Sequence, residues 1–273
     1  MTDFYGKGVV ITGAASGIGR LMALAISKAG GRLALWDINE TGLENVSAEI
    51  STAGGQAVTV PCNLSDRLSI AEAAEKTLQS LGAIDVLINN AGIVSGKDLL
   101  EITEEQIELT FNVNTLALFW TTRAFLPAML ERDSGHIVTI ASAGGIAGTA
   151  KLVDYCSSKF AAVGFDDSLR AELKQRKSNV MTTVVCPYYI DTGMFDGVST
   201  RFPSLLPILD AEKSVRKIIA AISKNRRRLI MPWFVYTTYL MRLAPVGLSD
   251  WMLDFFGVTH SMDRFVGRNT DSS

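Results

Sequence analysis

Short apolar runs alternate along the chain with longer segments that carry apolar residues at helical spacing. Strands are predicted at KGVVIT, RLALW, QAVTVP, IDVLIN, GHIVTIAS, VMTTVVCP and RRLIMP. Helices are predicted over about residues 18–29, 40–53, 66–81, 103–130, 155–176 and 211–223. Right-handed crossovers between seven such strands place helices on both faces of a parallel sheet. The pattern therefore predicts a single doubly wound α/β domain of the Rossmann type.

The pattern changes towards the end of the chain. Residues 1–232 carry the alternation, whereas residues 233–273 are rich in apolar residues and predict a C-terminal helical extension. Ligands of parallel sheets bind at the carboxyl ends of the strands, so the loops that follow the strands are the expected site of function. The loop at about residues 188–210 follows the sixth strand and is long enough to form a substrate lid.

Composition narrows the class of protein. The chain has 273 residues, of which 48% are hydrophobic, and a formal net charge of −2. A sheet covered on both faces accounts for the hydrophobic content, and the balanced charge gives no sign of a nucleic-acid partner. Cys62, Cys156 and Cys186 have no metal-ligand spacing. The amino terminus has no apolar run typical of a membrane span or secretory signal, so we expect a cytoplasmic protein with reduced thiols.

The loop after the first strand reads TGAASGIG. Gly13, Gly17 and Gly19 let the backbone turn tightly and approach a ligand, and the helix that follows points unpaired N–H groups at the same place. A pyrophosphate suits this environment, although three glycines alone also fit a plain tight turn. Asp37 ends the second strand, where a carboxylate accepts hydrogen bonds from ribose hydroxyls and repels a 2′-phosphate. We therefore expect NAD rather than NADP, with capping of the next helix as the alternative role of Asp37.

Four features together resemble the short-chain dehydrogenase/reductase family: TGAASGIG, NNAG, YCSSK, and a serine 13 residues before the tyrosine. The resemblance covers about residues 6–232. LWDIN, FWTTRAFLPAML and YCSSKFAAVGF are most similar to the subgroup of retinol and 17-beta-hydroxysteroid dehydrogenases, whose members act on lipophilic alcohols and are commonly microsomal or on lipid droplets. The resemblance also implies a homodimer or homotetramer built on the helices at 103–130 and 155–176, with Phe111, Phe119, Trp120 and Phe125 as apolar contacts.

Tyr155 and Lys159 lie four residues apart, on one face of the predicted helix. An ammonium group a few ångströms from a phenol favours the phenolate, so the pair suits a general base for an alcohol proton. Tyrosine and lysine at this spacing are also frequent on solvated helix faces. The glycine loop and the other motifs named above favour the catalytic interpretation. In the family's pattern Ser142 holds the substrate oxygen and Asn114 anchors a water beside Lys159.

The resemblance also implies a dinucleotide site. It would comprise Gly13, Ser16, Gly17, Ile18, Gly19, Asp37, Asn63, Leu64, Asn90, Ala91, Gly92, Tyr155, Lys159, Pro187, Ile190 and Thr192. Three departures stand out: the hydrophobic amino-terminal anchor of the subgroup is missing, the usual aspartate after strand three is Asn63, and the usual Pro-Gly is Pro187-Tyr188. Asn63 could still accept an adenine amino group through its side-chain oxygen.

The lid and the tail indicate the substrate. The lid is apolar and suits a lipophilic alcohol or aldehyde, retinoid- or steroid-like. The tail combines aromatic and basic residues, which fit a peripheral membrane contact, a cover for the pocket or a subunit contact. The sequence thus predicts an NAD(H)-dependent oxidoreductase. Alternatives are a carbonyl reductase of broad specificity and a non-catalytic dinucleotide sensor or lipid-surface scaffold, against which the intact Ser142, Tyr155 and Lys159 argue.

Overall fold

The computed structural model describes residues 1–267 and contains one parallel sheet of seven strands. The strand order is β3-β2-β1-β4-β5-β6-β7. The strands are β1 (Gly8–Thr12), β2 (Arg32–Asp37), β3 (Gln56–Pro61), β4 (Val86–Asn89), β5 (His136–Ile140), β6 (Met181–Pro187) and β7 (Arg228–Met231). All seven predicted strands are present, and the predicted doubly wound α/β fold is confirmed.

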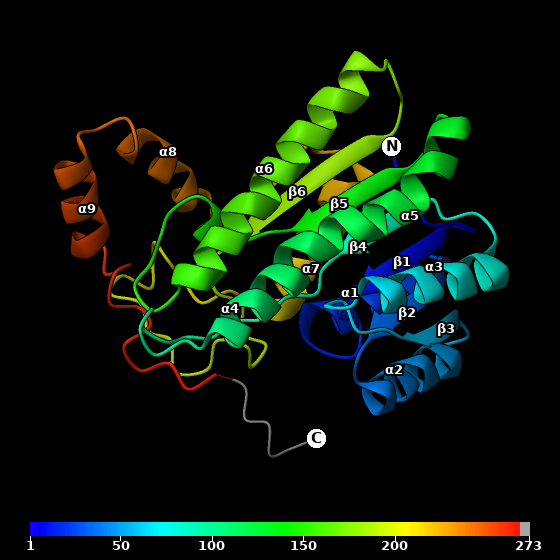
Figure 1. Cartoon of the computed structure of the whole chain (residues 1–273), viewed down its shortest axis with the longest axis horizontal. Coiled ribbons are helices and arrows are strands. Elements are labelled where there is room, and N and C mark those ends of the chain that lie inside the picture. The colour runs from blue at the N-terminus through cyan, green and yellow to red at the C-terminus, as the bar shows by residue number, and fades with distance from the viewer. Residues whose placement is uncertain (268–273) are drawn as a thin grey trace.

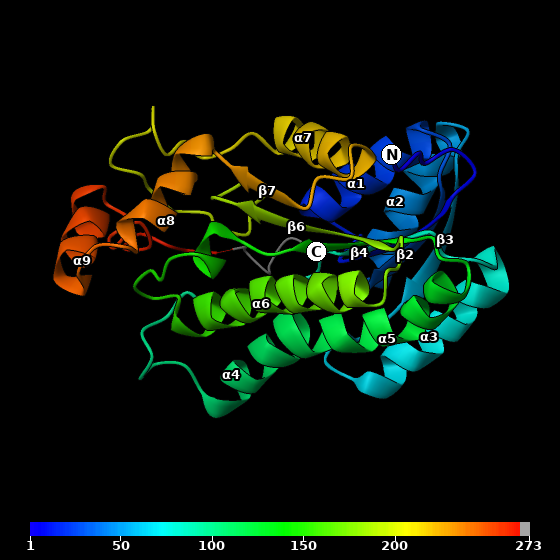
Figure 2. The same cartoon turned by 90° about the horizontal axis from the view of Figure 1, so that it is seen from above.

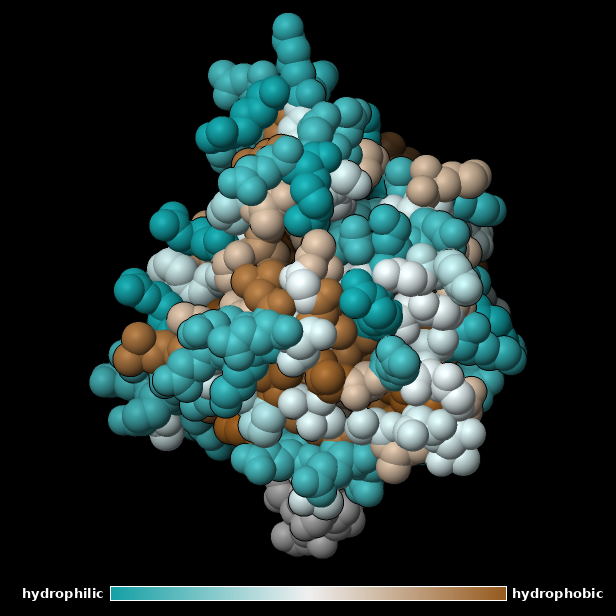
Figure 3. Space-filling view, turned by 90° about the vertical axis from the view of Figure 1, so that its right-hand side faces the viewer, coloured by the Kyte–Doolittle hydropathy of each residue, from teal (hydrophilic) through white to brown (hydrophobic). Residues whose placement is uncertain are grey.

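Helices cover both faces of the sheet (Figures 1 and 2). One layer holds α1 (Gly17–Lys28), α2 (Glu40–Thr52) and α7 (Ala211–Ser223), and the other holds α3 (Arg67–Leu81), α4 (Glu104–Phe111), α5 (Ala117–Glu131) and α6 (Val153–Gln175). The central strand β1 reads GVVIT and is buried at every position because apolar cores lie on both of its sides. Figure 3 views the end of the molecule at the right of Figure 1, where hydrophilic side chains surround a central apolar area.

The helix predicted over residues 103–130 is interrupted. A π-helical segment, Asn112–Leu116, separates α4 from α5. The side chain of Asn114 in this segment bonds the backbone of Ile93 and the hydroxyl of Ser158, and such one-turn bulges often occur at functional sites. Apolar periodicity did not reveal the interruption, because the backbone at its flanking residues, Phe111 and Ala117, keeps helical φ and ψ angles.

The aromatic residues expected at a subunit contact are not equally available. Phe125 is fully buried and packs against Trp36 with ring centroids 5.9 Å apart, so its predicted role at an interface is wrong. Phe119 is 43% exposed, and Leu109 and Leu116 on the same helical run are exposed as well. The exposed apolar residues of α4 and α5 therefore differ in part from those that the sequence suggested.

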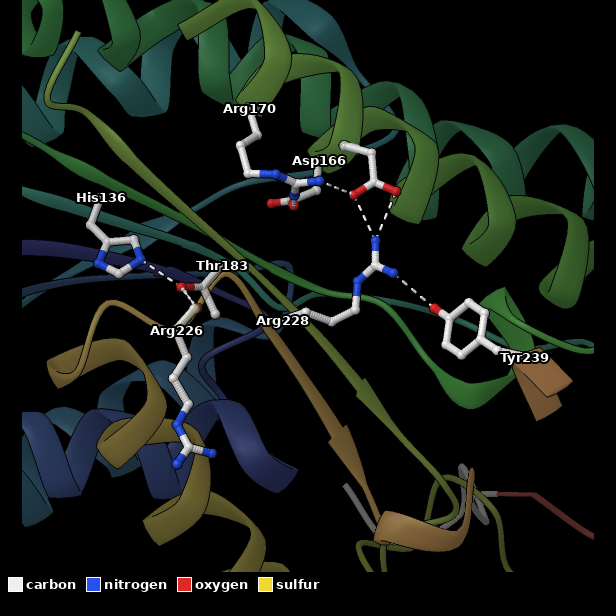
Figure 4. A network of polar contacts seen from close by, with 8 residues as sticks. His136, Asp166, Arg170, Thr183, Arg226, Arg228 and Tyr239 are labelled. Carbon is white, nitrogen blue, oxygen red and sulfur yellow. Dashed lines mark hydrogen bonds and ion pairs between the residues drawn. The ribbon is translucent and has the colours of Figure 1, made fainter. Parts of the chain in front are cut away.

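The C-terminal segment forms a short 3-10 helix at Trp233–Tyr236, then α8 (Thr237–Met241) and α9 (Val246–Phe255). These helices project from one end of the molecule (Figures 1 and 2). The guanidinium of Arg228 lies between α6 and α8, donating to Asp167 at 2.6 Å and to the hydroxyl of Tyr239 at 2.9 Å (Figure 4). None of the helices in residues 1–267 has the length and hydropathy needed to cross a membrane. The last six residues of the predicted extension lie outside the described residues.

Candidate active site

The glycine loop between β1 and α1 forms a cradle with no room for side chains. Gly13 and Gly17 have positive φ angles of 66° and 56°. A Cβ on Gly13 would lie 2.8 Å from the Cα of Ala91, and one on Gly19 would lie 2.0 Å from the carbonyl oxygen of Gly13. The first N–H groups of α1 have no acceptor within the helix and suit an anion. This cradle fits the pyrophosphate of a dinucleotide.

Asp37 braces the glycine loop from the end of β2. Its Oδ2 accepts a hydrogen bond from the backbone N–H of Ala15 at 3.0 Å, and its Oδ1 accepts one from Asn39 at 3.0 Å. The alternative that Asp37 caps the next helix is wrong, because Asn39 is the N-cap of α2 and accepts from Gly42. A carboxylate has about four lone-pair positions, so Asp37 retains acceptor capacity towards the cavity that it lines.

Two asparagines after β3 and β4 occupy different settings. The Nδ2 of Asn90 donates to the carbonyl oxygens of Thr12 and Gly13, which ties β4 to the glycine loop. Asn63 also lines the cavity, but its Oδ1 accepts from both the N–H and the hydroxyl of Ser65. Because Oδ1 already accepts two hydrogen bonds, it is not available for the adenine amino group as expected. The Nδ2 group of Asn63 is left to contact a ligand.

Tyr155, Lys159 and Ser142 meet at the carboxyl end of β5. Tyr155 and Lys159 are both buried on α6, and Lys159 Nζ lies 5.7 Å from the centre of the Tyr155 ring. This Nζ donates to the carbonyl oxygen of Ile140 at 3.0 Å. Ser142 caps a 3-10 turn by accepting from the N–H of Gly144 and hydrogen-bonds Tyr155. The four-residue spacing thus brings phenol, ammonium and hydroxyl to one place.

Burial dominates the electrostatics of this pair. It raises the pKa of Tyr155 well above the ordinary value of a phenol, and the hydrogen bond with Ser142 opposes this rise. Burial also lowers the pKa of Lys159 to about 8. In the protein alone the pKa of Tyr155 is therefore raised, contrary to the sequence-based expectation that Lys159 lowers it, because burial of the phenol is the dominant effect.

Asn114 sits behind the reacting groups. It is 1% exposed, and its Oδ1 accepts from the N–H of Ile93 at 2.8 Å. Gly92 separates it from the lysine: a Cβ on Gly92 would lie 3.2 Å from Lys159 Nζ and 3.3 Å from Asn114 Oδ1. Asn114 does not line the main cavity, unlike the other three predicted catalytic residues.

One cavity of about 500 Å³ joins these groups. All sixteen residues expected at the dinucleotide line it, together with Ser142. Its charged lining residues in the described part of the chain are Asp37 and Lys159. The remaining wall is largely apolar, and much of it comes from the lid and the C-terminal segment: Tyr188, Tyr189, Met194, Phe195, Leu206, Phe234, Val235, Met241, Leu253, Phe256 and Val258.

A strap at residues 258–267 completes the cover over Tyr155, and the sequence did not reveal it. The hydroxyls of Tyr189 and Ser261 lie 2.9 Å apart and link the lid to the strap. Phe195 packs edge-on against Tyr155 at 5.7 Å and lies 6.5 Å from Phe265. The strap has neither strand nor helix periodicity, and its aromatic and small residues are the only sequence signal.

Comparison with known proteins agrees with this geometry. The chain matches the family described as short chain dehydrogenase over residues 7–201. It is 43% identical over 264 residues to epidermal retinol dehydrogenase 2 of Homo sapiens, covering 96% of this chain and 85% of that protein. It is also 43% identical over 242 residues to estradiol 17-beta-dehydrogenase 11 of Homo sapiens, covering 88% and 80%.

Solved structures share the fold. A short chain dehydrogenase/reductase from Burkholderia phymatum in complex with NAD has a TM-score of 0.81 at 26% identity, covering 89% of this chain and 95% of that one. A metagenomic short-chain oxidoreductase in complex with NADP has a TM-score of 0.71 at 28% identity, covering 84% and 98%. Both neighbours hold a nicotinamide dinucleotide, and they differ in which one.

Proposed function

Because the chain belongs to the short-chain dehydrogenase/reductase family, we propose that it is an NAD(H)-dependent oxidoreductase that interconverts a lipophilic alcohol and its aldehyde or ketone. The observation that carries this proposal is the meeting of Ser142, Tyr155 and Lys159 at one wall of a largely apolar cavity. A bound dinucleotide would accept or donate the hydride. The protein supplies binding, orientation and the path of the proton.

The choice of NAD rests on charge. Asp37 lines the cavity beside the glycine loop, and there its carboxylate would accept hydrogen bonds from ribose hydroxyls and repel a 2′-phosphate. Arg20 directly follows the glycine loop, and its guanidinium pairs with Glu49. A 2′-phosphate would therefore meet a carboxylate and an arginine that is already paired.

In the proposed reaction Tyr155 exchanges a proton with the substrate oxygen. Ser142 lies within hydrogen-bond reach of the phenol and would orient the same oxygen. The buried phenol holds its proton firmly, so Tyr155 is well suited to protonate a carbonyl oxygen, and oxidation of an alcohol requires compensating positive charge. Lys159, held by Ile140, supplies one such charge.

The substrate class follows from the cavity wall. The lid and the C-terminal segment present aromatic and aliphatic side chains. Arg201 lies within the lid, but it stacks on Phe202 and Phe255 and does not line the cavity. Such a wall favours an uncharged lipophilic substrate. Retinoids and steroids are the first candidates, in keeping with the names of the relatives.

Turnover of a panel of retinoid, steroid and medium-chain alcohols with NAD and with NADP tests the proposal. We expect reduced nicotinamide to form with NAD, and Tyr155→Phe to lower kcat by about 10²–10⁴-fold while NADH still binds. Ser142→Ala serves as the matched variant that keeps the phenol and removes its partner. Unchanged turnover in Tyr155→Phe would refute the mechanism.

Asp37→Ser tests the cofactor assignment. Loss of charge-assisted hydrogen bonds of about 1.5–3 kcal/mol predicts a drop of roughly 10–150-fold in kcat/KM with NAD and a gain with NADP. Asp37→Asn is the control that keeps acceptor oxygen for Ala15 and removes the charge. If the wild type, Asp37→Ser and Asp37→Asn all have the same ratio of NAD to NADP activity, the proposed role of Asp37 is contradicted.

We also propose that the protein self-associates through α4, α5 and α6. Phe119 is exposed and packs edge-on against Phe165 of α6 with centroids 4.9 Å apart. Exposed Leu109 and Leu116 extend this apolar area along the helices. Sedimentation velocity of the wild type and of Phe119→Glu tests this self-association. If both proteins sediment as monomers, the proposal is refuted.

A further inference from the structure

The helical run from Trp233 to Met241 is apolar on two opposite faces. Val235, Thr238 and Met241 recur every three residues, are at most 9% exposed and line the cavity. Trp233 and Leu240 face away from them and are 72% and 71% exposed. The inner face of this run is therefore covered by the protein, whereas its outer face exposes large apolar side chains.

The outer face continues beyond the run. Leu243 and Val246 are 84% and 76% exposed, and Leu248 at the start of α9 is 50% exposed. Together with the preceding aromatic and aliphatic residues they define the C-terminal apolar face: Trp233, Tyr236, Leu240, Leu243, Val246 and Leu248. Single exposed apolar residues are ordinary on protein surfaces, whereas six of them within the sixteen positions from 233 to 248 indicate a contact surface.

Charge and shape decide what this surface contacts. Residues 233–249 contain no acidic residue. The single arginine among them, Arg242, donates to the carbonyl oxygen of Ile146, and its guanidinium lies 5.2 Å from the centre of the Phe160 ring. The surface therefore buries no anion on contact with an apolar phase. It lies on helices that project from the end of the molecule (Figures 1 and 2).

We propose that the C-terminal apolar face inserts into the interfacial layer of a lipid surface, and that a lipophilic substrate passes from the lipid into the cavity beneath it. This inference rests on the proposed function for the nature of the substrate. Tryptophan and tyrosine prefer the lipid–water boundary, and a peripheral helix buries its apolar face to a depth of about 5–10 Å. Trp233 and Tyr236 supply these aromatic rings, and Met241 on the inner side reaches the cavity.

A second copy of the chain fits this surface less well. A stable interface takes about 800 Å² and roughly 20–30 residues from each partner. The C-terminal apolar face comprises six side chains, fewer than the number of residues that such an interface takes from one partner. A bilayer, by contrast, deforms around a projection and needs no complementary shape.

Flotation of the full chain with vesicles of neutral phosphatidylcholine tests the proposal. The test variant is Leu240→Glu with Leu243→Glu, which places two charges on the face and leaves the residues that line the cavity untouched. The control is Leu68→Glu on α3, a leucine of similar exposure, 69%, outside the C-terminal segment. We expect the wild type and the control to float, and the double variant to bind vesicles at least tenfold less.

Turnover of a short water-soluble alcohol, measured in the same samples, separates this proposal from the proposed function. We expect all three proteins to share that activity, and only the double variant to lose activity on substrate dissolved in vesicles. The lipid contact is overturned if the wild type does not float, or if the double variant floats equally well. It is also overturned if the wild type is a dimer that does not bind vesicles and that the two substitutions dissociate. Flotation without turnover of any alcohol would instead contradict the proposed function and leave the lipid contact standing.

Discussion

Replacing Asp166 by asparagine should change how the stability of the protein depends on pH. Asp166 lies on α6 with 1% of its surface exposed, and Arg170 donates to it at 2.8 Å (Figure 4). Burial raises the pKa of its carboxyl from 3.8 to about 7, and the charges of Arg170 and Arg228 oppose the rise only in part. The folded protein therefore holds a proton here that the unfolded chain releases.

The sign and size of the effect follow from this difference. Below the unfolded pKa both states are protonated and the carboxyl costs nothing, whereas stability falls as pH rises from about 4 through about 7. Between about pH 5.5 and about pH 8 the loss due to Asp166 amounts to about 2 kcal/mol. Asp166→Asn should remove this loss, because an amide keeps an acceptor for Arg170 and has no proton to release.

Urea unfolding at several pH values measures the effect. His136, buried at the start of β5, has its pKa lowered to about 4 by burial, so its own contribution to stability falls as pH drops below about 6.5. This opposite slope is common to wild type and variant and cancels in their difference. Glu72→Gln, which removes an exposed negative charge on α3, is the control. If the stability difference between Asp166→Asn and wild type stays constant from about pH 5.5 to about pH 8, the linkage argument is refuted.

Three further predictions follow from the site and the core. Gly19→Ala should lower dinucleotide affinity at least about tenfold, since its Cβ would lie 2.0 Å from the carbonyl oxygen of Gly13; titration of protein fluorescence with NADH checks this, and unchanged affinity would disprove the close approach. Asn114→Ala should lower the free energy of unfolding by about 1–3 kcal/mol and also lower kcat, because both backbone groups of Ile93 lose their partner; urea unfolding and steady-state kinetics measure the two effects. The three free thiols should react slowly with a disulfide reagent in the native protein and quickly in urea, because burial raises the pKa of Cys62 and Cys156 to about 11 and of Cys186 to about 12; fast reaction of a native thiol would contradict their burial.

Local sequence patterns predict the strands, the helices and the glycine loop of this protein well. The run GVVIT is buried on both faces and reads as an apolar strand, and the tyrosine and lysine of α6 meet because four residues make about one helical turn. The glycine loop can also be predicted from the sequence, because positive φ angles at Gly13 and Gly17 and close backbone contacts at Gly13 and Gly19 restrict these positions to glycine. These features depend on residues that are close in sequence.

Features that depend on distant residues escaped prediction. The π-helical turn at Asn114 is fixed by Ile93 and Ser158, and the strap is fixed by the contact of Ser261 with Tyr189. In the protein alone burial raises the pKa of Tyr155, which the sequence did not indicate because it shows the neighbouring charge of Lys159 and not the depth of burial. Helix periodicity reports which face is apolar and is silent on how deep a given hydroxyl lies.

Part of the apolar cavity wall lies outside the segment that carries the reacting groups. The match to the short chain dehydrogenase family spans residues 7–201, which hold the glycine loop, Asp37 and the reacting groups around Tyr155. The apolar wall between Leu206 and Val258 lies beyond that range. We expect that variation there changes which molecules fit beside Tyr155 and leaves Ser142, Tyr155 and Lys159 in place. Exchange of residues 233–258 between this protein and a relative should therefore move substrate preference, while cofactor preference stays with Asp37.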